Sequence, residues 1–344
     1  MTVAYDLSNT AYRGLIREDV MNEIFAIDPV DLPYMDMAST GKSTNPYKEW
    51  TKESLAAPAL PTPVLDGASA PAASSFTEAR IGDHHEINTK KVSVSDRAGT
   101  VDTIGYSNRL VHELMVRQKE MKRSMESGLL SNKASVAMTD SVPGQYAGCG
   151  AMFTTAAHII NGTTGGFSAG IFAAPTPGAA AALTETNVRA AMSVAYKAGG
   201  NPTIMMSLPE MIEKFSSYLF TASARIATLT STNATSKNGK YGKQGITAVG
   251  SVNTFVTDFG TLELTPNRVQ LQYTVSGTTT CCNVYLFDPN YWEVSYLQGI
   301  QTKELAKTGL TNDRLMSVDY TNCALQEKSS AVLMGQNYAL AVTA

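Results

Sequence analysis

The chain contains 344 residues, of which 43% are hydrophobic and 17% are charged. This balance is typical of a folded protein of about two domains and argues against a disordered one. The formal net charge is −3, and the sequence has neither the clustered Lys and Arg that neutralise nucleic acid nor an apolar run that could cross a bilayer. Because its start does not resemble a secretory signal, we expect a soluble protein made in a cytosol.

The cysteines are expected to be small buried side chains rather than ligands or cross-links. Four cysteines in a chain of this length, without C-x-x-C spacing, make neither a disulfide framework nor a zinc ribbon nor a redox motif. They are Cys149, Cys281, Cys282 and Cys323.

Residues 1–37 are predicted to form an N-terminal arm. Apolar residues recur near helical spacing from Leu15 to Ile27, and the prolines of DPVDLP then end the helix. Acidic side chains surround this apolar stripe, and so short a helix is marginally stable alone in water. The arm is therefore expected to lie on another surface.

Residues 38–97 are predicted to form a long two-stranded ribbon with an irregular tip. Residues 44–55 and 84–95 have strand character, whereas residues 56–75 between them are rich in Pro and Ala. Such a ribbon is marginally stable by itself, and its edges invite pairing with another chain. This segment favours a protein that assembles over a lone monomer.

The stretch STGKST, residues 39–44, matches the second half of a phosphate-binding loop. The full pattern requires a glycine where the chain has Asp36, and a hydrophobic strand before the loop, which the preceding prolines prevent. We therefore interpret Gly41 as the site of a sharp turn into the ribbon, not as part of a nucleotide site.

Residues 102–133 give the clearest helical pattern in the chain. Five apolar residues fall on one face, charged residues including Glu126 surround them, and Asp102 is a candidate N-cap or first-turn acid. At 1.5 Å per residue the helix would be about 45 Å long, which suits a flat, plate-like molecule. The apolar face consists of Leu110, Leu114, Met121, Met125 and Leu129.

The rest of the chain is predicted to be an α/β unit that follows an irregular insertion. Residues 136–183 are rich in Gly, Ala, Thr and Ser and show no regular period. A helix with a Thr/Glu start and a glycine stop is expected within 183–200, and a buried strand followed by a helix within 202–218. A hairpin is expected to turn at 258–260, and the remainder is rich in strands.

Two short motifs that could support chemistry lack their partners. GFSAG, residues 166–170, matches a hydrolase nucleophile elbow around Ser168, but all four histidines precede the serine and no strand leads into it. Adjacent His84 and His85 would point to opposite faces of a strand and could not easily share a metal ion. We therefore predict no catalytic, cofactor or metal site, and keep a Ser168 hydrolase only as an alternative of another class.

Four stretches of the sequence carry a family resemblance. They are IFAIDPVDLPYMDM (24–37), YKEWTKESLAAPALPTPVLDGASA (47–70), SNRLVHELMVRQKEMKRSMESGLLSNKA (107–134), and DPNYWEVSYLQGIQTKELAKTG (288–309) with EKSSAVLMG (327–335). Together they resemble the major capsid proteins of tailed bacteriophages with the Hong Kong 97-like fold, most closely the podovirus-type major head proteins. The resemblance implies an α+β fold.

The resemblance also implies a division of the chain. It gives an N-terminal arm at 1–37, an E-loop at 38–97, a peripheral domain with a spine helix at 98–135, an axial domain at 136–290, and strands at 291–344 that return to the peripheral domain. Residues 136–183 and 270–283 are longer than the family's usual connections. We expect them to be surface decoration or contacts near a symmetry axis.

The function implied by the resemblance is that of a major capsid protein. Pentamers and hexamers would form an icosahedral or prolate head of a virion, assembled in the host bacterial cytoplasm, that encloses double-stranded DNA without sequence-specific binding. Scaffolding, portal and decoration proteins would be partners, and no membrane or cofactor is implied. A shell protein of a non-viral compartment with the same fold is the alternative. The expected contacts with adjacent subunits are Trp50, Leu55, Pro58, Leu60, Val64 and Leu65 in the E-loop and Ile24, Phe25 and Ile27 in the arm.

Overall fold

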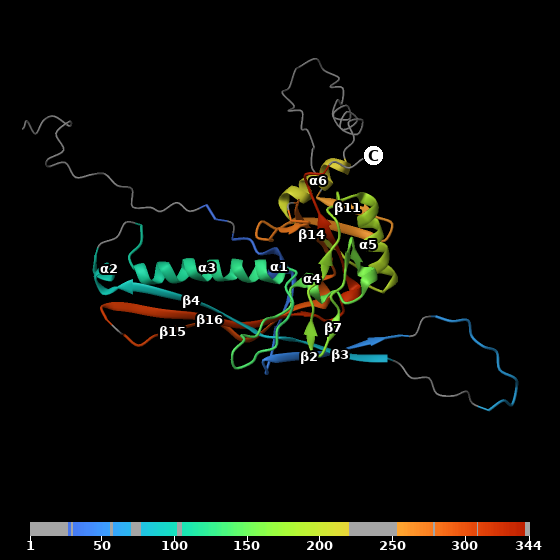
Figure 1. Ribbon diagram of the computed structural model, residues 1–344, viewed down its shortest axis with the longest axis horizontal. Coiled ribbons are helices and arrows are strands. Elements are labelled where there is room, and N and C mark those ends of the chain that lie inside the picture. The colour runs from blue at the N-terminus through green and yellow to red at the C-terminus, as the bar shows by residue number, and fades with distance from the viewer. Residues whose placement is uncertain are drawn as a thin grey trace, which may run out of the picture.

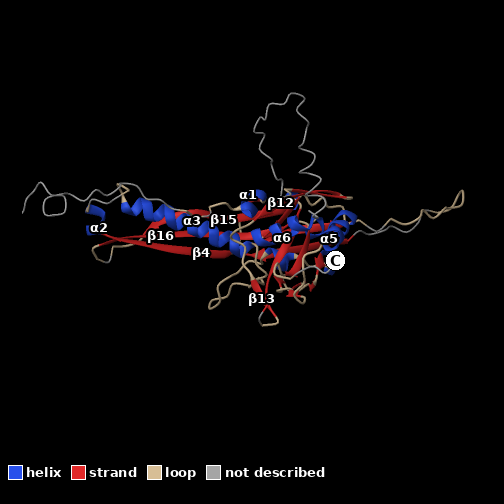
Figure 2. Cartoon of the chain, turned by 90° about the horizontal axis from the view of Figure 1, so that it is seen from above, coloured by secondary structure: helices blue, strands red, loops and turns tan. Residues whose placement is uncertain are grey.

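The computed structural model describes residues 27–340, apart from residues 29, 56–57, 70–76, 102–104, 220–252, 278 and 308. In this part of the chain, two sheets and one long helix form an elongated plate that is thin when seen edge-on (Figure 1, Figure 2). The long helix lies over a narrow sheet in one half of the plate, and a wider sheet with two helices forms the other half. The mixed α+β content and the flat shape are as expected.

A four-stranded sheet forms the narrow half, with strand order β1–β15–β16–β4. β1 is parallel to β15, and the other neighbours are antiparallel. The alternation predicted through Ile87, Val92 and Val94 is only partly confirmed: Val92 and Val94 are buried, whereas Ile87 is 62% exposed. The strands are Ser39–Lys42 (β1), Glu86–Ser95 (β4), Trp292–Glu304 (β15) and Thr311–Ala324 (β16).

The spine helix α3 (Arg109–Leu129) lies beside β4 and β16 (Figure 1). Its predicted apolar face is confirmed, because the residues nearest its C-terminal end are buried and those nearer its start are partly buried. The fully buried residues are Met121, Met125 and Leu129, and the partly buried ones are Leu110 and Leu114.

The start of α3 differs from the prediction. The side chain of Asn108, not that of Asp102, caps the helix by accepting a hydrogen bond from the backbone N–H of Val111 at 3.2 Å. Gly105 has φ +83°, which an α-helix cannot accommodate. Asp102 lies outside the described residues. The 21 residues of α3 span about 31 Å rather than 45 Å. A short helix, α2 (Asp96–Thr100), connects β4 to this region.

A wider sheet forms the other half of the plate, with strand order β11–β12–β10–β14–β17–β5 and β13 paired to β14. Its strands are Ile159–Ile160 (β5), Ile204–Ser207 (β10), Thr254–Thr257 (β11), Gly260–Pro266 (β12), Tyr273–Val275 (β13), Thr279–Phe287 (β14) and Ala331–Gln336 (β17). The expected helices are present as α5 (Glu185–Lys197), capped by the Thr184 hydroxyl, and α6 (Pro209–Leu219). The predicted β11–β12 hairpin is also confirmed.

The C-terminal strands do not all return to the narrow half. β15 and β16 do so, but β17 pairs with β14 and β5 in the wide sheet. The expectation that 291–344 belongs to the peripheral side is therefore wrong for 331–336. Two short 3-10 helices, Pro289–Tyr291 (η2) and Glu327–Ser329 (η3), lie where the chain passes between the two halves.

The insertion at 136–183 is part of the core rather than surface decoration. Tyr146, Phe153 and Phe172 from this segment are among the largest fully buried side chains. Small residues let its backbone approach other segments closely, which explains a composition without periodicity. Its elements are α4 (Cys149–Met152), η1 (Ala156–His158), β5 of the wide sheet, and two small antiparallel pairs formed by β6 (Gly162–Thr163) with β9 (Thr176–Pro177) and β7 (Phe167–Ser168) with β8 (Ile171–Phe172).

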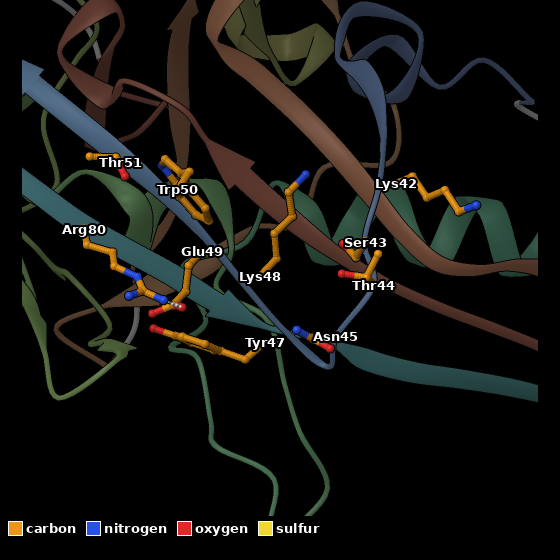
Figure 3. Close-up of a pocket in the computed structure, with 10 residues that line it drawn as sticks. All are labelled: Lys42, Ser43, Thr44, Asn45, Tyr47, Lys48, Glu49, Trp50, Thr51 and Arg80. Atoms are coloured by element: carbon orange, nitrogen blue, oxygen red, sulfur yellow. Dashed lines mark hydrogen bonds and ion pairs between the residues drawn. The ribbon is translucent and has the colours of Figure 1, made fainter.

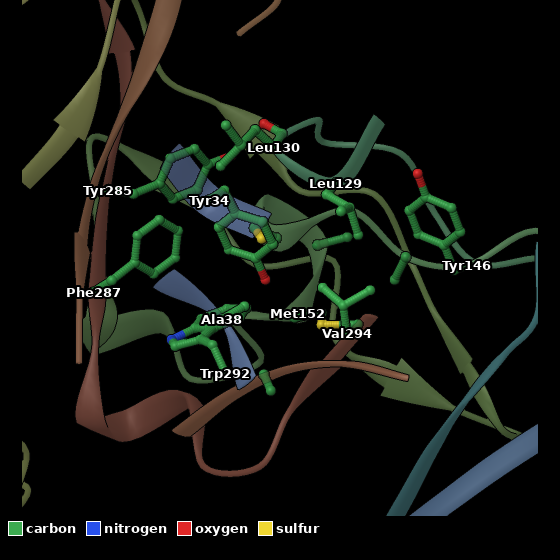
Figure 4. Packing of buried hydrophobic residues seen from close by; sticks show 14 of the residues in the cluster. Tyr34, Ala38, Leu129, Leu130, Tyr146, Met152, Tyr285, Phe287, Trp292 and Val294 are labelled. Atoms are coloured by element: carbon green, nitrogen blue, oxygen red, sulfur yellow. The ribbon is translucent and has the colours of Figure 1, made fainter. Parts of the chain in front are cut away.

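One aromatic cluster joins the two halves of the plate. Trp292, at the start of β15, packs against Phe287 of the wide sheet with ring centroids 5.0 Å apart and against Phe153 of the insertion at 5.7 Å. Tyr34, near the end of the predicted arm, lies in the same cluster (Figure 4). The four cysteines are buried and unpaired, as predicted.

Candidate assembly surfaces

The E-loop ribbon is a two-stranded sheet of β2 (Tyr47–Ser54) and β3 (Thr77–His84). Its register runs from Tyr47 opposite His84 to Ser54 opposite Thr77. The predicted ribbon partner, residues 84–95, is wrong: the chain kinks at His85 and continues as β4 in the narrow sheet. The ribbon extends from the edge of the plate (Figure 1).

The described residues at the tip of the E-loop expose large apolar side chains. Leu55, Leu60 and Leu65 are 96%, 94% and 86% exposed, and Val64 is 72% exposed. Pro58 is exposed as well. Burying one such leucine or valine side chain is favourable by roughly 1.5–3 kcal/mol. Covering the whole tip with another surface would therefore be strongly favourable.

Trp50 differs from the other predicted E-loop contacts, because it packs against its own subunit. It is partly buried against the aromatic cluster, and its indole N–H donates to the carbonyl oxygen of Ala324 at 3.0 Å. We therefore leave Trp50 out of the contact set proposed below. Its role in the structure is to attach β2 to the end of β16.

Two lysines on the same strand also attach the ribbon to its own subunit. Lys48 pairs with Glu293 of β15, and Lys52 pairs with Glu327 of η3. The Glu327 carboxylate also accepts hydrogen bonds from the hydroxyls of Thr154 (2.7 Å) and Thr155 (3.0 Å). Burial opposes ionisation there, but Lys52 and the two hydroxyls hold the pKa of Glu327 below its usual value.

The stretch STGKST is a strand followed by a turn. Residues 39–42 form β1 beside β15, and the sharp change of direction comes at 43–46. A Cβ at Gly41 would collide with the Glu293 carboxyl group, so the glycine leaves room for the partner of Lys48. The interpretation of Gly41 as the turn itself is therefore wrong.

A polar pocket of about 370 Å³ lies at this root of the ribbon (Figure 3). No helix follows the strand, so the strand–loop–helix arrangement of a phosphate-binding loop is not formed here. The pocket is lined by Lys42, Ser43, Thr44, Asn45, Tyr47, Lys48, Glu49, Trp50, Thr51 and Arg80.

Asp83 fixes the kink between β3 and β4. Its buried carboxylate accepts hydrogen bonds from the backbone N–H groups of Ala147 (2.8 Å) and His84 (2.9 Å) and from the Thr321 hydroxyl (3.3 Å). Burial nevertheless raises the pKa of the Asp83 carboxyl to about 8. No periodic pattern marked this residue as buried, because charged residue types are normally expected at the surface.

The predicted arm contacts lie mostly outside the described residues. Ile24 and Phe25, together with the helix expected between Leu15 and Ile27, are outside the described part of the chain. Ile27 is described and fully exposed. The arm ends at α1 (Pro33–Met37), whose Tyr34 is completely buried.

The motif around Ser168 does not form a nucleophile elbow. Ser168 ends β7, and the chain turns at Ala169 (φ +52°) and Gly170 (φ +79°) directly into β8. An elbow requires a strand–turn–helix, so the hydrolase expectation fails on geometry. Among the described residues, no group of His, Cys, Asp and Glu could hold a metal ion, and no helix is long and apolar enough to cross a membrane.

A spine helix across a narrow sheet, a second α/β domain and a projecting ribbon define a shell-forming subunit of the Hong Kong 97-like class. The structure is similar to a chain of Mycobacterium phage Bobi (11% identity, 94% of this chain and 96% of that one, TM-score 0.57). It is similar to the capsid of a native GTA particle (9%, 97% and 99%, TM-score 0.61). It also resembles the holo-SrpI encapsulin complex of Synechococcus elongatus PCC 7942 (12%, 99% and 99%, TM-score 0.55).

The sequence itself places the chain in a family. The model of the SU10 major capsid protein family matches residues 2–337, and the chain belongs to this family. The comparison with curated proteins found no match. The protein is therefore a phage major capsid protein, a structural component of a virion.

Proposed function

We propose that copies of this capsid protein join into pentamers and hexamers whose tiling closes an icosahedral or prolate head around double-stranded DNA. The observation that carries the proposal is the E-loop tip, where four large apolar side chains are 72–96% exposed on a ribbon whose root is attached to the subunit. A surface of this kind suits burial against another copy.

Each E-loop would lie on the adjacent subunit of the ring. This contact is heterologous, since the loop of one copy meets a different surface of the next, and such contacts form rings where the rotation between copies closes. Four buried side chains at roughly 1.5–3 kcal/mol each give a gross gain near 6–12 kcal/mol, before the cost of ordering the loop. The contact residues proposed are Leu55, Pro58, Leu60, Val64 and Leu65.

The arm would add a second contact to a neighbour, through Ile24, Phe25 and Ile27. Two contacts per subunit reinforce each other, because the first raises the effective concentration of the second. We retain the division into arm (1–37), E-loop (38–97), peripheral (98–135) and axial (136–290) segments, with β4 assigned to the peripheral sheet and β17 to the axial one.

The remaining partners follow from the capsid role. Scaffolding, portal and decoration proteins would guide assembly in the host cytoplasm, and the subunit itself would have no enzymatic activity. A net charge of −3 suits a container that is filled by a separate motor and does not bind DNA by sequence.

A non-viral compartment shell is the second candidate, because the SrpI encapsulin shares the fold over 99% of this chain. The contents of particles purified from the native source distinguish the two. Nuclease-protected DNA of genome length would support the phage head, whereas a packaged protein would support the compartment.

The assembly itself is tested with the full chain expressed alone. Sedimentation and negative-stain microscopy should show rings or closed shells. A protein that stays a single subunit at every concentration and ionic strength would contradict the proposal.

A further inference from the structure

The described end of the arm and the start of the E-loop lie in one short segment, residues 33–46. α1 is the last element of the arm, β1 follows it after a single residue, and β2 begins directly after the turn that ends at Pro46. Whatever fixes α1 and β1 therefore fixes the direction in which both extensions start. We call residues 33–46 the shared root.

The arm end of the shared root is attached to the spine helix by Glu126. This carboxylate is completely buried and accepts hydrogen bonds from the backbone N–H groups of Tyr34 (2.7 Å) and Met35 (3.0 Å). First-turn N–H groups have no partner inside their own helix, and Pro33 contributes none. Glu126 therefore caps α1 from a different element of the fold.

The same carboxylate reaches the axial half of the molecule. The Asn267 side-chain amide, just after β12, donates to Glu126 at 2.7 Å. One buried anion thus connects the shared root, the spine helix and the wide sheet. The sequence placed Glu126 on the charged face of the helix, and nothing in its spacing revealed this role.

Side-chain packing completes the attachment of α1. The Tyr34 hydroxyl donates to Asn322 Oδ1 at 2.7 Å, and its ring lies 5.4 Å from that of Phe287 and 6.3 Å from that of Trp292 (Figure 4). β1 then pairs with β15 in a fixed register, from Ser39 opposite Glu293 to Lys42 opposite Tyr296. Because α1 and β1 are both held against the subunit, the backbone between the arm and the ribbon has little conformational freedom.

We propose that Glu126 is a positioning residue for shell assembly: by holding the first turn of α1, it sets the directions in which the arm and the E-loop reach neighbouring subunits. The inference rests on the proposed function, since both extensions must make inter-subunit contacts for their direction to matter. A buried carboxylate suits the task, because charge-assisted hydrogen bonds are short and strongly directional.

The test is Glu126→Gln in the full chain. Glutamine keeps the size of the side chain but turns an N–H group toward donors, so at least one backbone bond is lost. We expect amide exchange at Tyr34 or at Met35, whichever loses its acceptor, to become at least about tenfold faster, corresponding to about 1.4 kcal/mol. Microscopy should then show open or mixed-diameter particles where the native chain forms uniform shells.

Two controls separate positioning from simple loss of stability. Tyr146→Phe removes a buried hydroxyl contact with Tyr320 but none of the hydrogen bonds to α1, and Glu120→Gln changes a partly exposed carboxylate of the same helix that pairs with Lys90 and Arg117. Both should give uniform shells. The same particle mixture from Tyr146→Phe, at a comparable fall in melting temperature, would overturn the proposal.

Uniform native-diameter shells from Glu126→Gln would also overturn it. Should that variant not fold, Asn267→Ala removes one of the three donors and is judged by the same criteria. If the native chain forms no shells, the proposed function fails instead, and the exchange rates at Tyr34 and Met35 then test only the capping of α1.

Discussion

The root and the tip of the E-loop belong to one ribbon, yet their side chains have opposite surroundings. At the root, Trp50 and Lys52 contact the body of the subunit, whereas Leu60 and Leu65 at the tip are almost fully exposed. Contacts at the root contribute to the stability of the single subunit. Side chains at the tip contribute nothing there and remain available to a neighbour.

The largest loss of stability is expected from truncating Trp292 in the aromatic cluster. Trp292→Ala should lower the free energy of unfolding by about 3–5 kcal/mol, because truncating a buried Trp loses its transfer free energy and leaves a cavity. Trp292 is fully buried, and its indole N–H donates to the Ser330 hydroxyl at 2.9 Å. Urea denaturation measures the loss, and a fall below 1 kcal/mol would contradict the assignment of this cluster as the core.

Removing the charge of Lys52, where the E-loop ribbon joins its own subunit, should have the next largest effect on the free energy of unfolding. Lys52→Met leaves the Glu327 carboxylate, whose side chain is 2% exposed, without its counter-ion. Breaking a buried pair typically costs 3–5 kcal/mol, and we expect about 2–3 kcal/mol here because two hydroxyls still donate to Glu327. The measurement is urea denaturation together with amide exchange in β2.

The matched control for this variant is Lys42→Met, because Lys42 is an exposed lysine at the end of β1, beside the same end of the ribbon. Its free energy of unfolding should stay within about 0.5 kcal/mol of the native value. Equal losses from the two variants would show that the Lys52 pair does not hold the ribbon.

The buried carboxyl at the kink should make stability depend on pH. The pKa of Asp83 rises from 3.8 to about 8 on folding, so between these values the folded chain keeps a proton that the unfolded chain has lost. Its contribution is complete below pH 3.8 and is lost as the pH rises toward 8, by up to about 1.4 kcal/mol per pH unit. Asp83→Asn removes this titration. As the pH rises from 3.8 to about 8, the melting temperature of the native chain should therefore fall steadily relative to that of the variant. Parallel curves across the window would contradict the shift.

The smallest stability effect is expected at the tip. Leu60→Ser combined with Leu65→Ser should leave the free energy of unfolding of the isolated subunit within about 0.5 kcal/mol of the native value, because neither side chain is buried. Thermal unfolding of unassembled subunits measures it. A loss of several kcal/mol would mean that the tip folds back onto its own subunit.

Sequence reasoning succeeded where the signal was local. The capped helix at Glu185–Lys197, the β11–β12 hairpin and the apolar face ending at Leu129 are each specified by neighbouring residues. The leucines of the tip are exposed, which agrees with the contacts implied by the family resemblance, and their contact with a neighbour stays a prediction.

It failed where the answer depended on distant segments. The alternation around Val92 and Val94 fits a ribbon or a sheet equally well, and only pairing with β16 decides between them. Small residues hid the buried insertion at 136–183, and charge hid Glu126 and Asp83, because burial of a carboxylate depends on donors that come from elsewhere in the chain.

Replacing residues 55–76 with a short Gly-Ser turn tests most directly whether the tip serves the neighbour rather than its own subunit. We predict folded subunits with a native melting temperature that sediment without forming shells, under conditions in which the native chain forms them. Closed shells of native diameter from the shortened chain would contradict the account.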